Sequence, residues 1–203
     1  MKVMKQTNKP MDSEEVEIAP ISVEKLRADK TGALVEQIVA LVYHALREPL
    51  WSNAHGKPRL HFGLGIVMMR RNALAFIAKT KPSAKIIGHS LGFEVFRESE
   101  DPRDPALYEI SGTRALDGLF EGGARVFYGD SLCVDPGFRR RHIAYRLCIA
   151  QMDVLRREGF TYRIGRTAIA AEAMRALYNK LGFQESPVHD ALYPEKTYWL
   201  LRL

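Results

Sequence analysis

The sequence predicts a mixed α/β fold, in which helices pack on a twisted mixed sheet. Segments with helical periodicity alternate with short β-rich runs, in the order β-α-α-β-β-β-α-β-α-β-β. Glycine and proline gather between these segments, where turns are expected. The 203 residues are 46% hydrophobic, which suffices for one core. We therefore expect a single domain over residues 1–203, with a flexible lead-in over 1–13.

The first half of the chain is predicted to hold a strand, two helices and a hairpin. Apolar residues at helical spacing predict the stronger helix, and Pro49 ends it. The expected elements are a strand over 16–21, helices over 31–47 and 60–71, a loop over 48–59, and antiparallel strands over 73–79 and 86–97. Residues 98–123 carry Pro, Gly and mixed charge, so we expect a substrate-facing flap with one helical turn.

The second half is predicted to alternate between strand and helix. Gly159 and Gly182 are natural residues at which helices end, because glycine adopts the left-handed conformation that follows a helix. The expected elements are a strand over 125–134, a helix over 140–158, a strand over 160–169, a helix over 172–181 and a closing strand over 197–203.

The junction from Val134 to Ala144 is the most informative part of the chain. A β-rich run leads into it, and an amphipathic helix leads out. The first N–H groups of a helix have no partner within the helix, and the macrodipole places partial positive charge there. Such a junction is a ready site for phosphate, and the three arginines at 139–141 strengthen the case for an anionic ligand.

Composition narrows the classes of function. Lys and Arg exceed Asp and Glu by 30 to 24, for a formal net charge of +6, which suits a polyanionic ligand. Aromatic residues are not interleaved with basic ones, so pure nucleic-acid binding is disfavoured. The histidines form no H-E-x-x-H pattern or Cys/His cluster, so no metal is expected. Two cysteines, no signal-like start and no long apolar run predict a cytoplasmic protein without a membrane span.

Two motifs resemble those of the GNAT N-acetyltransferase superfamily, and the order of elements fits over about 16–203. The family's pyrophosphate loop runs Val-x-Pro-x-x-Arg-Gly-x-Gly-Ile-Gly/Ala; the matching residues are Val134, Pro136, Arg139, Ile143 and Ala144. The segment Leu177–Phe183 matches the family's Leu-Tyr-x-Lys-x-Gly-Phe at each defined position. Arg140 and His142 depart from the pattern, because they stand where the family often has glycine.

The resemblance implies a GNAT fold, with a central sheet splayed between its fourth and fifth strands. It implies acyl transfer from an acyl-CoA, acetyl-CoA first, to a primary amine by direct attack in a ternary complex. No metal is expected to take part. Relatives are often dimers, so the resemblance is also compatible with a homodimer. Main-chain groups of Leu132 and Val134 would pair with the pantetheine arm. The implied cofactor-binding residues are Leu132, Cys133, Val134, Arg139, Arg140, Arg141, His142, Ile143, Ala144 and Tyr145.

The resemblance also implies catalytic roles. Tyr178 would be the general acid that protonates the departing thiolate. The base is predicted to be Asp130, acting directly or through water, because it shares strand parity with Leu132 and Val134. Glu94 and Glu109 are the reserves. The acceptor amine would be selected by the loops over 48–59, 98–123 and 186–195, whose mixed charge does not identify it.

Three alternatives stay open. One is a longer acyl-CoA or acyl carrier protein donor, as in relatives that make acyl amino acids or acyl-homoserine lactones. Another is a serine hydrolase, because Gly88–Gly92 reads G-x-S-x-G with Ser90 at its centre. That motif needs a helix after the serine, whereas the residues that follow alternate like a strand. The third is a nucleic-acid-binding module.

Overall fold

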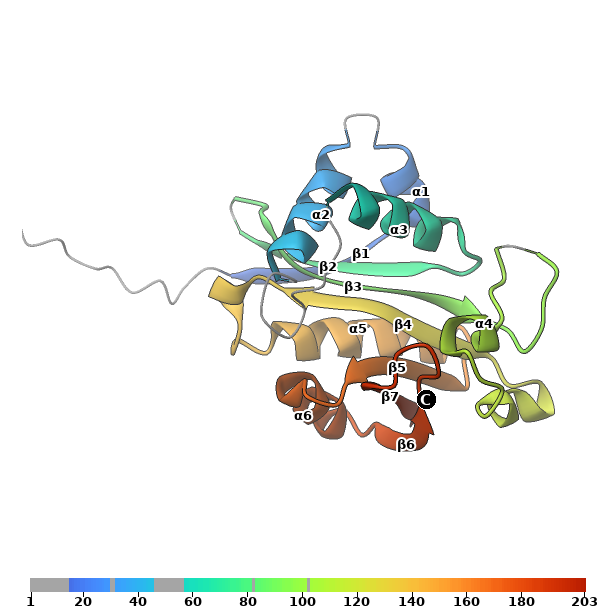
Figure 1. Ribbon diagram of the computed structural model, residues 1–203. Coiled ribbons are helices and arrows are strands. Elements are labelled where there is room, and N and C mark those ends of the chain that lie inside the picture. Colours follow the sequence, from blue (N-terminus) through green and yellow to red (C-terminus); the bar gives the residue numbers. More distant parts are fainter. Residues whose placement is uncertain (1–14, 30–31, 46–56, 82, 102) are drawn as a thin grey trace, which may run out of the picture.

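A seven-stranded mixed sheet forms the centre of the protein (Figure 1). The structure, a computed structural model, describes residues 15–29, 32–45, 57–81, 83–101 and 103–203. The strand order is β1-β2-β3-β4-β5-β7-β6, and β4 and β5 are the parallel pair at its middle. The strands are β1 (Val16–Ile21), β2 (Leu74–Thr80), β3 (Ile86–Val95), β4 (Val126–Val134), β5 (Tyr162–Ala168), β6 (Gln184–His189) and β7 (Lys196–Arg202).

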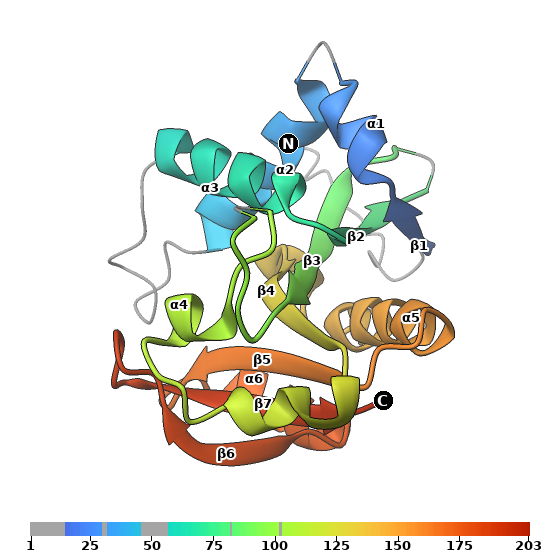
Figure 2. The ribbon, with the colours of Figure 1, turned by 90° about the vertical axis from the view of Figure 1, so that its right-hand side faces the viewer.

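Helices cover both faces of this sheet. In Figure 1, α1–α3 lie above the sheet and α5 and α6 lie below it. Figure 2 shows α4 and α5 on opposite sides of β4. The helical elements are α1 (Val23–Arg27), α2 (Ala33–Ala45), α3 (Lys57–Met69), α4 (Leu107–Ser111), η2 (Asp117–Gly123), η3 (Pro136–Phe138), α5 (Ile143–Arg157) and α6 (Glu172–Lys180).

The core is divided by the sheet into two main layers. On the α2 side, Ile38 and Leu41 pack with apolar residues of β2–β4, as their helical spacing predicts. On the other side, Ile143 and Leu147 of α5 pack against Phe76. Helix α5 is therefore fixed along its length against the sheet, and its N-terminus is held at the end of β4.

The sheet opens between β4 and β5. These strands pair only over Val126–Gly129 and Tyr162–Gly165, so the last part of β4 has no neighbour on that side among the described strands. Residues 131–134 are half-buried, whereas Val126, Phe127 and Tyr128 are buried. The predicted splay between the fourth and fifth strands is confirmed, and it leaves an unpaired strand edge that an extended ligand could join.

A β-bulge lies in β4 at the start of the splay. Leu91 pairs with Ser131 while Gly92 pairs with Gly129, so Asp130 is an extra residue without a partner on β3. A bulge reverses the alternation of side chains along a strand. Accordingly Leu132 packs in the α5 layer, while the Sγ atom of Cys133 contacts the Leu41 carbonyl of α2.

The predicted elements agree with the structure except in three segments. Helix α1 was not predicted, and β6 occupies the first part of the expected 186–195 loop. Residues 98–123 are not a flap with a single turn: they contain α4 and η2, and Leu107 and Leu116 are buried. The lead-in over 1–13 and residues 48–56 of the 48–59 loop lie outside the described residues; 57–59 belong to α3. No helix in the described ranges is long and apolar enough to cross a membrane.

Candidate functional site

The turn between β4 and α5 is anchored by Asp135. Its Oδ1 accepts a hydrogen bond from the Gly137 amide at 2.9 Å, and its Oδ2 pairs with Lys85 Nζ at 3.0 Å. The Asp135 amide in turn donates to the Ile87 carbonyl of β3 at 2.8 Å. These contacts tie both the backbone and the side chain of the turn to β3, so the turn is positioned before any ligand arrives.

Arg140 and His142 adopt the left-handed conformation in this turn, with φ of 65° and 58°. These are the two positions at which the sequence departs from the glycine pattern. The backbone therefore keeps the path that glycine would take, although side chains make that path unfavourable by about 1 kcal/mol or more each. Strain of this kind persists where the surrounding structure holds it in place, and it concentrates at binding sites.

The backbone amides from Arg140 to Tyr145 have no acceptor among the described residues. The first amide that bonds back is that of Arg146, to the His142 carbonyl at 3.0 Å. These donors lie at the positive end of the macrodipole of α5, which is 15 residues long. Arg140 is exposed and Arg141 lies over the Phe138 ring, at 5.2 Å from its centroid. The turn can therefore bind an anion through main chain and side chains together.

Tyr178 lies at the splay, on the α5 and α6 side of the sheet. Its ring stacks on Trp199, with centroids 5.5 Å apart, and packs against Phe183 at 4.8 Å. A β-carbon added to Gly165 of β5 would overlap the Tyr178 hydroxyl. Burial raises the pKa of Tyr178 far above its usual value, although the nearby Arg163 charge opposes that shift. Tyr178 is therefore a protonated hydrogen-bond donor at neutral pH.

Asp130 lies on the opposite side of β4 from Leu132, contrary to the parity prediction. The bulge is the reason, since the extra residue turns the carboxylate away from the α5 layer. The Asp130 side chain is exposed, yet desolvation by the surrounding protein raises its pKa; the charges of Arg166 and Arg70 partly oppose this. A side chain on the wall of a concave site is both open to solvent and surrounded by protein, as Asp130 is. A carboxylate with a raised pKa is a stronger base.

A buried network organises the same side of the sheet. Asp190 accepts hydrogen bonds from Arg166 Nη1 at 2.6 Å and from the Tyr198 hydroxyl at 2.7 Å. Its other oxygen accepts from the amides of Leu192 and Tyr193, at 2.8 and 2.9 Å. The network ties the loop between β6 and β7 to β5, beside Asp130, and so shapes this wall of the site.

The family of the chain follows from its residues 48–183, which match the model of the Acetyltransferase (GNAT) family. The chain belongs to the GNAT family. It is an acyl-CoA-dependent N-acyltransferase, an enzyme of the N-acetyltransferase class. A search of curated proteins finds no match.

Solved structures show the same GNAT fold at low sequence identity. The ribosomal-protein-S18-alanine N-acetyltransferase from Escherichia coli is 14% identical with a TM-score of 0.58, covering 93% of this chain and 94% of that one. The PaiA N-acetyltransferase from Thermoplasma acidophilum, in complex with coenzyme A, is 10% identical with a TM-score of 0.58 and covers 93% and 99%. A chain of the NatC complex bound to Gag peptide and CoA is 16% identical with a TM-score of 0.59 and covers 93% and 99%.

The G-x-S-x-G motif lies inside β3 of this GNAT fold. Ser90 is 1% exposed and donates a hydrogen bond to Gln151 Oε1 at 3.2 Å. A nucleophile elbow requires a sharp strand-to-helix turn that exposes the serine, and β3 continues for five residues beyond Ser90. The local geometry therefore does not support Ser90 as a nucleophile.

The reserve carboxylates have structural partners. Glu94 forms an ion pair with Arg125, in which Nε lies 2.8 Å from Oε1, and it also accepts from Asn72. Glu109 accepts from the Ala106 amide at the start of α4, at 3.3 Å. Among the described residues, no group of three or more His, Cys, Asp or Glu side chains could hold a metal ion.

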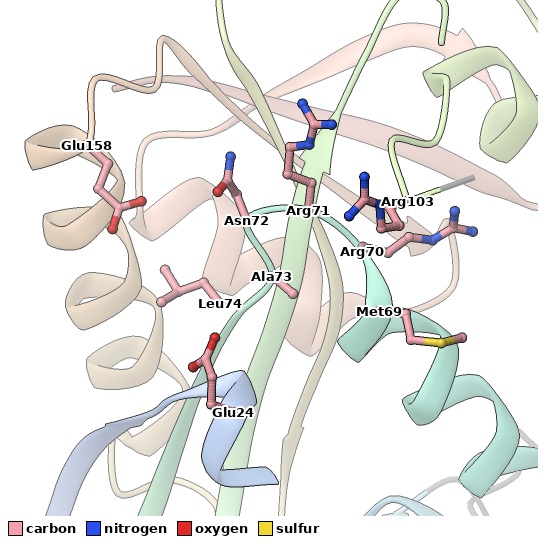
Figure 3. A pocket seen from close by; sticks show the side chains of 9 residues that line it. All are labelled: Glu24, Met69, Arg70, Arg71, Asn72, Ala73, Leu74, Arg103 and Glu158. Atoms are coloured by element: carbon pink, nitrogen blue, oxygen red, sulfur yellow. The ribbon is translucent and has the colours of Figure 1, made fainter. Parts of the chain in front are cut away.

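A polar pocket of about 390 Å³ lies at the turn between α3 and β2 (Figure 3). Figure 3 shows guanidinium groups on one side of it and the carboxylates of Glu24 and Glu158 on the other. Glu158 follows the C-terminus of α5, so the length of α5, roughly 22 Å, separates this pocket from the turn between β4 and α5. Arg71 pairs with Asp104 at 2.9 Å. The pocket contains none of the predicted site residues.

Sequence reasoning missed three residues at the splay: Gly129, Arg163 and Gly165. Gly129 and Gly165 pair across β4 and β5. A β-carbon at Gly165 would overlap Tyr178, whereas one at Gly129 would make ordinary contacts with Arg163 and the Ile164 carbonyl. Glycine inside a strand often marks a close approach by another group. The two strand glycines were therefore a usable signal, and Arg163, an arginine within a buried strand, was another.

Proposed function

We propose that this enzyme transfers an acetyl group from acetyl-CoA to a primary amine, by direct attack in a ternary complex. The observation that supports this most strongly is the placement of Tyr178 and Asp130. They flank the splay from opposite sides of the sheet, next to the Gly129–Gly165 pair. One side can therefore hold the thioester sulfur while the other receives the amine.

The donor would lie along the unpaired edge of β4. About 13 Å of extended strand separates Asp130 from Val134, which leads to the phosphate-binding turn. Main-chain groups of Leu132 and Val134 would pair with the pantetheine arm in the manner of an added strand. The amides from Arg140 to Tyr145 would bind the diphosphate, and the arginines at 139–141 would add charge-assisted hydrogen bonds.

The proposed reaction needs one base, one acid and one carbonyl-polarising group. Asp130, directly or through water, takes a proton from the amine, and its raised pKa suits that task. The bulge frees main-chain donors of β4, which would polarise the thioester carbonyl as negative charge develops on its oxygen. Tyr178 would give its proton to the departing thiolate.

The remaining assignments are also proposals. We propose that residues 1–203 act as one catalytic domain. We place the protein in the cytoplasm, because two cysteines are too few for a disulfide framework and fit a reducing compartment.

The deciding experiment is a thiol-release assay with acetyl-CoA and a panel of amines, amino acids and peptides. The expected result is amine-dependent release of CoA, with binding of CoA in calorimetry. Absence of CoA binding would contradict the proposal. Native mass spectrometry of freshly purified protein tests the donor, because a copurifying longer acyl-CoA would favour the alternative donor. Cleavage of p-nitrophenyl esters that Ser90→Ala abolishes would favour a hydrolase, and steeply salt-dependent shifting of DNA or RNA would favour nucleic-acid binding.

A further inference from the structure

Arg163 is a buried cation without a carboxylate partner among the described residues. It lies in β5 and is 4% exposed. Its Nη2 contacts the Sγ of Cys148 in α5 at 3.7 Å, and its Nη1 is buried with no hydrogen-bond partner in the described parts of the chain. An arginine stays charged in a protein, and a buried charge without a partner is strongly unfavourable. Its retention at this place calls for a role.

The guanidinium of Arg163 and the hydroxyl of Tyr178 lie at the two members of one glycine pair. A β-carbon on Gly129 would lie 3.6 Å from Arg163 Nη2, and one on Gly165 would overlap the Tyr178 hydroxyl. Gly129 and Gly165 are partners in the β4–β5 ladder, where neighbouring strands are about 4.8 Å apart.

The ring of Phe183 supports the same arrangement. The guanidinium carbon of Arg163 lies 5.4 Å from its centroid, and the centroid of the Tyr178 ring lies 4.8 Å from it. Both side chains therefore pack against Phe183, and the charge of Arg163 acts on the Tyr178 hydroxyl.

We propose that Arg163 is a positioning residue for Tyr178. The guanidinium cation of Arg163 stabilises the phenolate that forms when Tyr178 gives up its proton. This inference rests on the proposed function. As the amine nitrogen bonds to the acyl carbon, the C–S bond breaks and its electron pair goes to sulfur. The Tyr178 proton then joins that sulfur, and the phenolate stays beside Arg163 until solvent returns a proton.

The electrostatics at Tyr178 agree with this role. Burial raises the pKa of Tyr178, the charge of Arg163 lowers it, and Cys148 raises it by a smaller amount. Arg163 acts on the Tyr178 hydroxyl from β5, and Cys148 acts on it from α5. Because a buried phenol with a very high pKa is a weak general acid, a nearby cation moves Tyr178 toward the range in which it can donate.

The kinetic test compares Arg163→Met, Arg163→Lys, Tyr178→Phe and the double variant that combines Arg163→Met with Tyr178→Phe, using acetyl-CoA and a responsive amine. Arg163→Met is expected to lower kcat at least about tenfold with KM for acetyl-CoA within about twofold, and Arg163→Lys to restore most of the loss. In the Tyr178→Phe background, Arg163→Met is expected to add less than about twofold. An equal loss in both backgrounds would overturn the proposal.

The spectroscopic test needs no activity. A fluorinated tyrosine placed at 178 has a lower intrinsic pKa, so its ¹⁹F signal can be titrated. Arg163→Met is expected to raise the titration midpoint, and Arg163→Lys to leave it near that of the unsubstituted arginine. An unchanged midpoint in Arg163→Met would overturn the inference, and Arg163→Gln replaces it if the methionine variant does not fold. An inactive enzyme with a shifted midpoint would refute the proposed function alone.

Arg175 provides a matched control. It lies one turn before Tyr178 in α6, its guanidinium is 5.3 Å from the Trp199 centroid, and it pairs with Glu185 at 2.7 Å. Arg175→Met removes a cation from the same helix without touching the glycine pair. It is expected to leave both kcat and the ¹⁹F midpoint unchanged; a shift as large as that of Arg163→Met would show a general charge effect and overturn the inference.

Discussion

The Tyr178 hydroxyl packs directly against the backbone of Gly165 at the splay. The Tyr178 hydroxyl lies where a side chain at residue 165 would begin, so the strand must carry glycine for the helix residue to reach the sheet. Gly165 is paired with Gly129 in the β4–β5 ladder, so both strands carry glycine at this position. The depth at which Tyr178 enters the splay is therefore set by Gly165 of β5.

Gly165→Ala is expected to displace Tyr178. The added methyl group must push the ring away, so kcat should fall at least about tenfold, and stability should fall by about 1–3 kcal/mol through overpacking. Steady-state kinetics and urea unfolding measure the two effects. Gly118→Ala is the control, because a β-carbon there meets only Glu121 Oε1 at 3.8 Å. Unchanged kcat in Gly165→Ala would show that the position of the Tyr178 hydroxyl is irrelevant to turnover.

Tyr178→Phe is expected to lower kcat about a hundredfold or more, while KM for acetyl-CoA changes less than about twofold. The hydroxyl is lost, but the ring can keep its packing on Trp199 and Phe183, so the fold should survive. Thiol release under saturating acetyl-CoA measures the effect. Turnover equal to that of the wild type would remove Tyr178 from the mechanism.

Glycine at 142 is expected to stabilise the protein relative to alanine at 142, by about 1 kcal/mol. His142 has φ of 58°, a conformation that costs any residue with a β-carbon but not glycine. Within a helix the order is reversed, since alanine is favoured over glycine by about 1 kcal/mol. Urea unfolding of His142→Gly and His142→Ala measures the difference in the free energy of unfolding. Ala150→Gly in α5 is the control, in which glycine should lower that free energy. Alanine more stable than glycine at 142 would contradict the left-handed turn.

Asp130→Asn is expected to reduce kcat and to remove the acidic limb of its pH profile. Desolvation raises the pKa of Asp130, so in the wild type activity should fall as the pH falls through that raised value. The folded state also binds a proton more readily than the unfolded state, so the stability of the wild type decreases as pH rises from the unfolded pKa through the folded one. Asp130→Asn should therefore be the more stable protein at neutral pH, with the advantage lost below about pH 4. An intact acidic limb in this variant would assign the base elsewhere.

Asp190→Ala is expected to destabilise the protein by about 3 kcal/mol, because it leaves Arg166 and the Tyr198 hydroxyl without their acceptor. Burial tends to raise the pKa of Asp190, but hydrogen bonds from Tyr198 and Arg166 lower it overall. The stability that this carboxylate contributes is present above its unfolded pKa and is lost as pH falls through the lowered folded value. Urea unfolding across pH measures both. Asp153→Ala, at an exposed ion pair on α5, should change stability by less than about 0.5 kcal/mol.

Local patterns predicted most of the elements and the basic turn between β4 and α5. The helices α2, α5 and α6 follow from apolar spacing and from the glycines after the latter two, and the turn follows from a strand, a basic cluster and a helix start in succession. The segment over 98–123 was misread because its Pro and Gly content resembles a loop. Its apolar residues, Leu107 and Leu116, are buried by contacts with distant strands that a local pattern does not reveal.

The bulge at Asp130 shows the same limit at the site itself. Residues 126–134 read as one uninterrupted strand, and the extra residue is visible only in the register with β3. One shifted residue moves a side chain to the other face of a sheet, so the predicted parity of Asp130 with Leu132 was wrong. The choice of Asp130 as base stays a prediction, now supported by its raised pKa.

By itself, the sequence determined most helices and strands and the basic turn before α5, because turn chemistry, helix starts and short motifs depend on neighbours within a few positions. Only the tertiary structure decided that Arg163 lies at Gly129 and Tyr178 at its partner Gly165, and that Asp130 faces the other way. Those arrangements depend on strand register and on packing between segments far apart in the chain. Register is set by the summed fit of whole strands, which no single segment encodes.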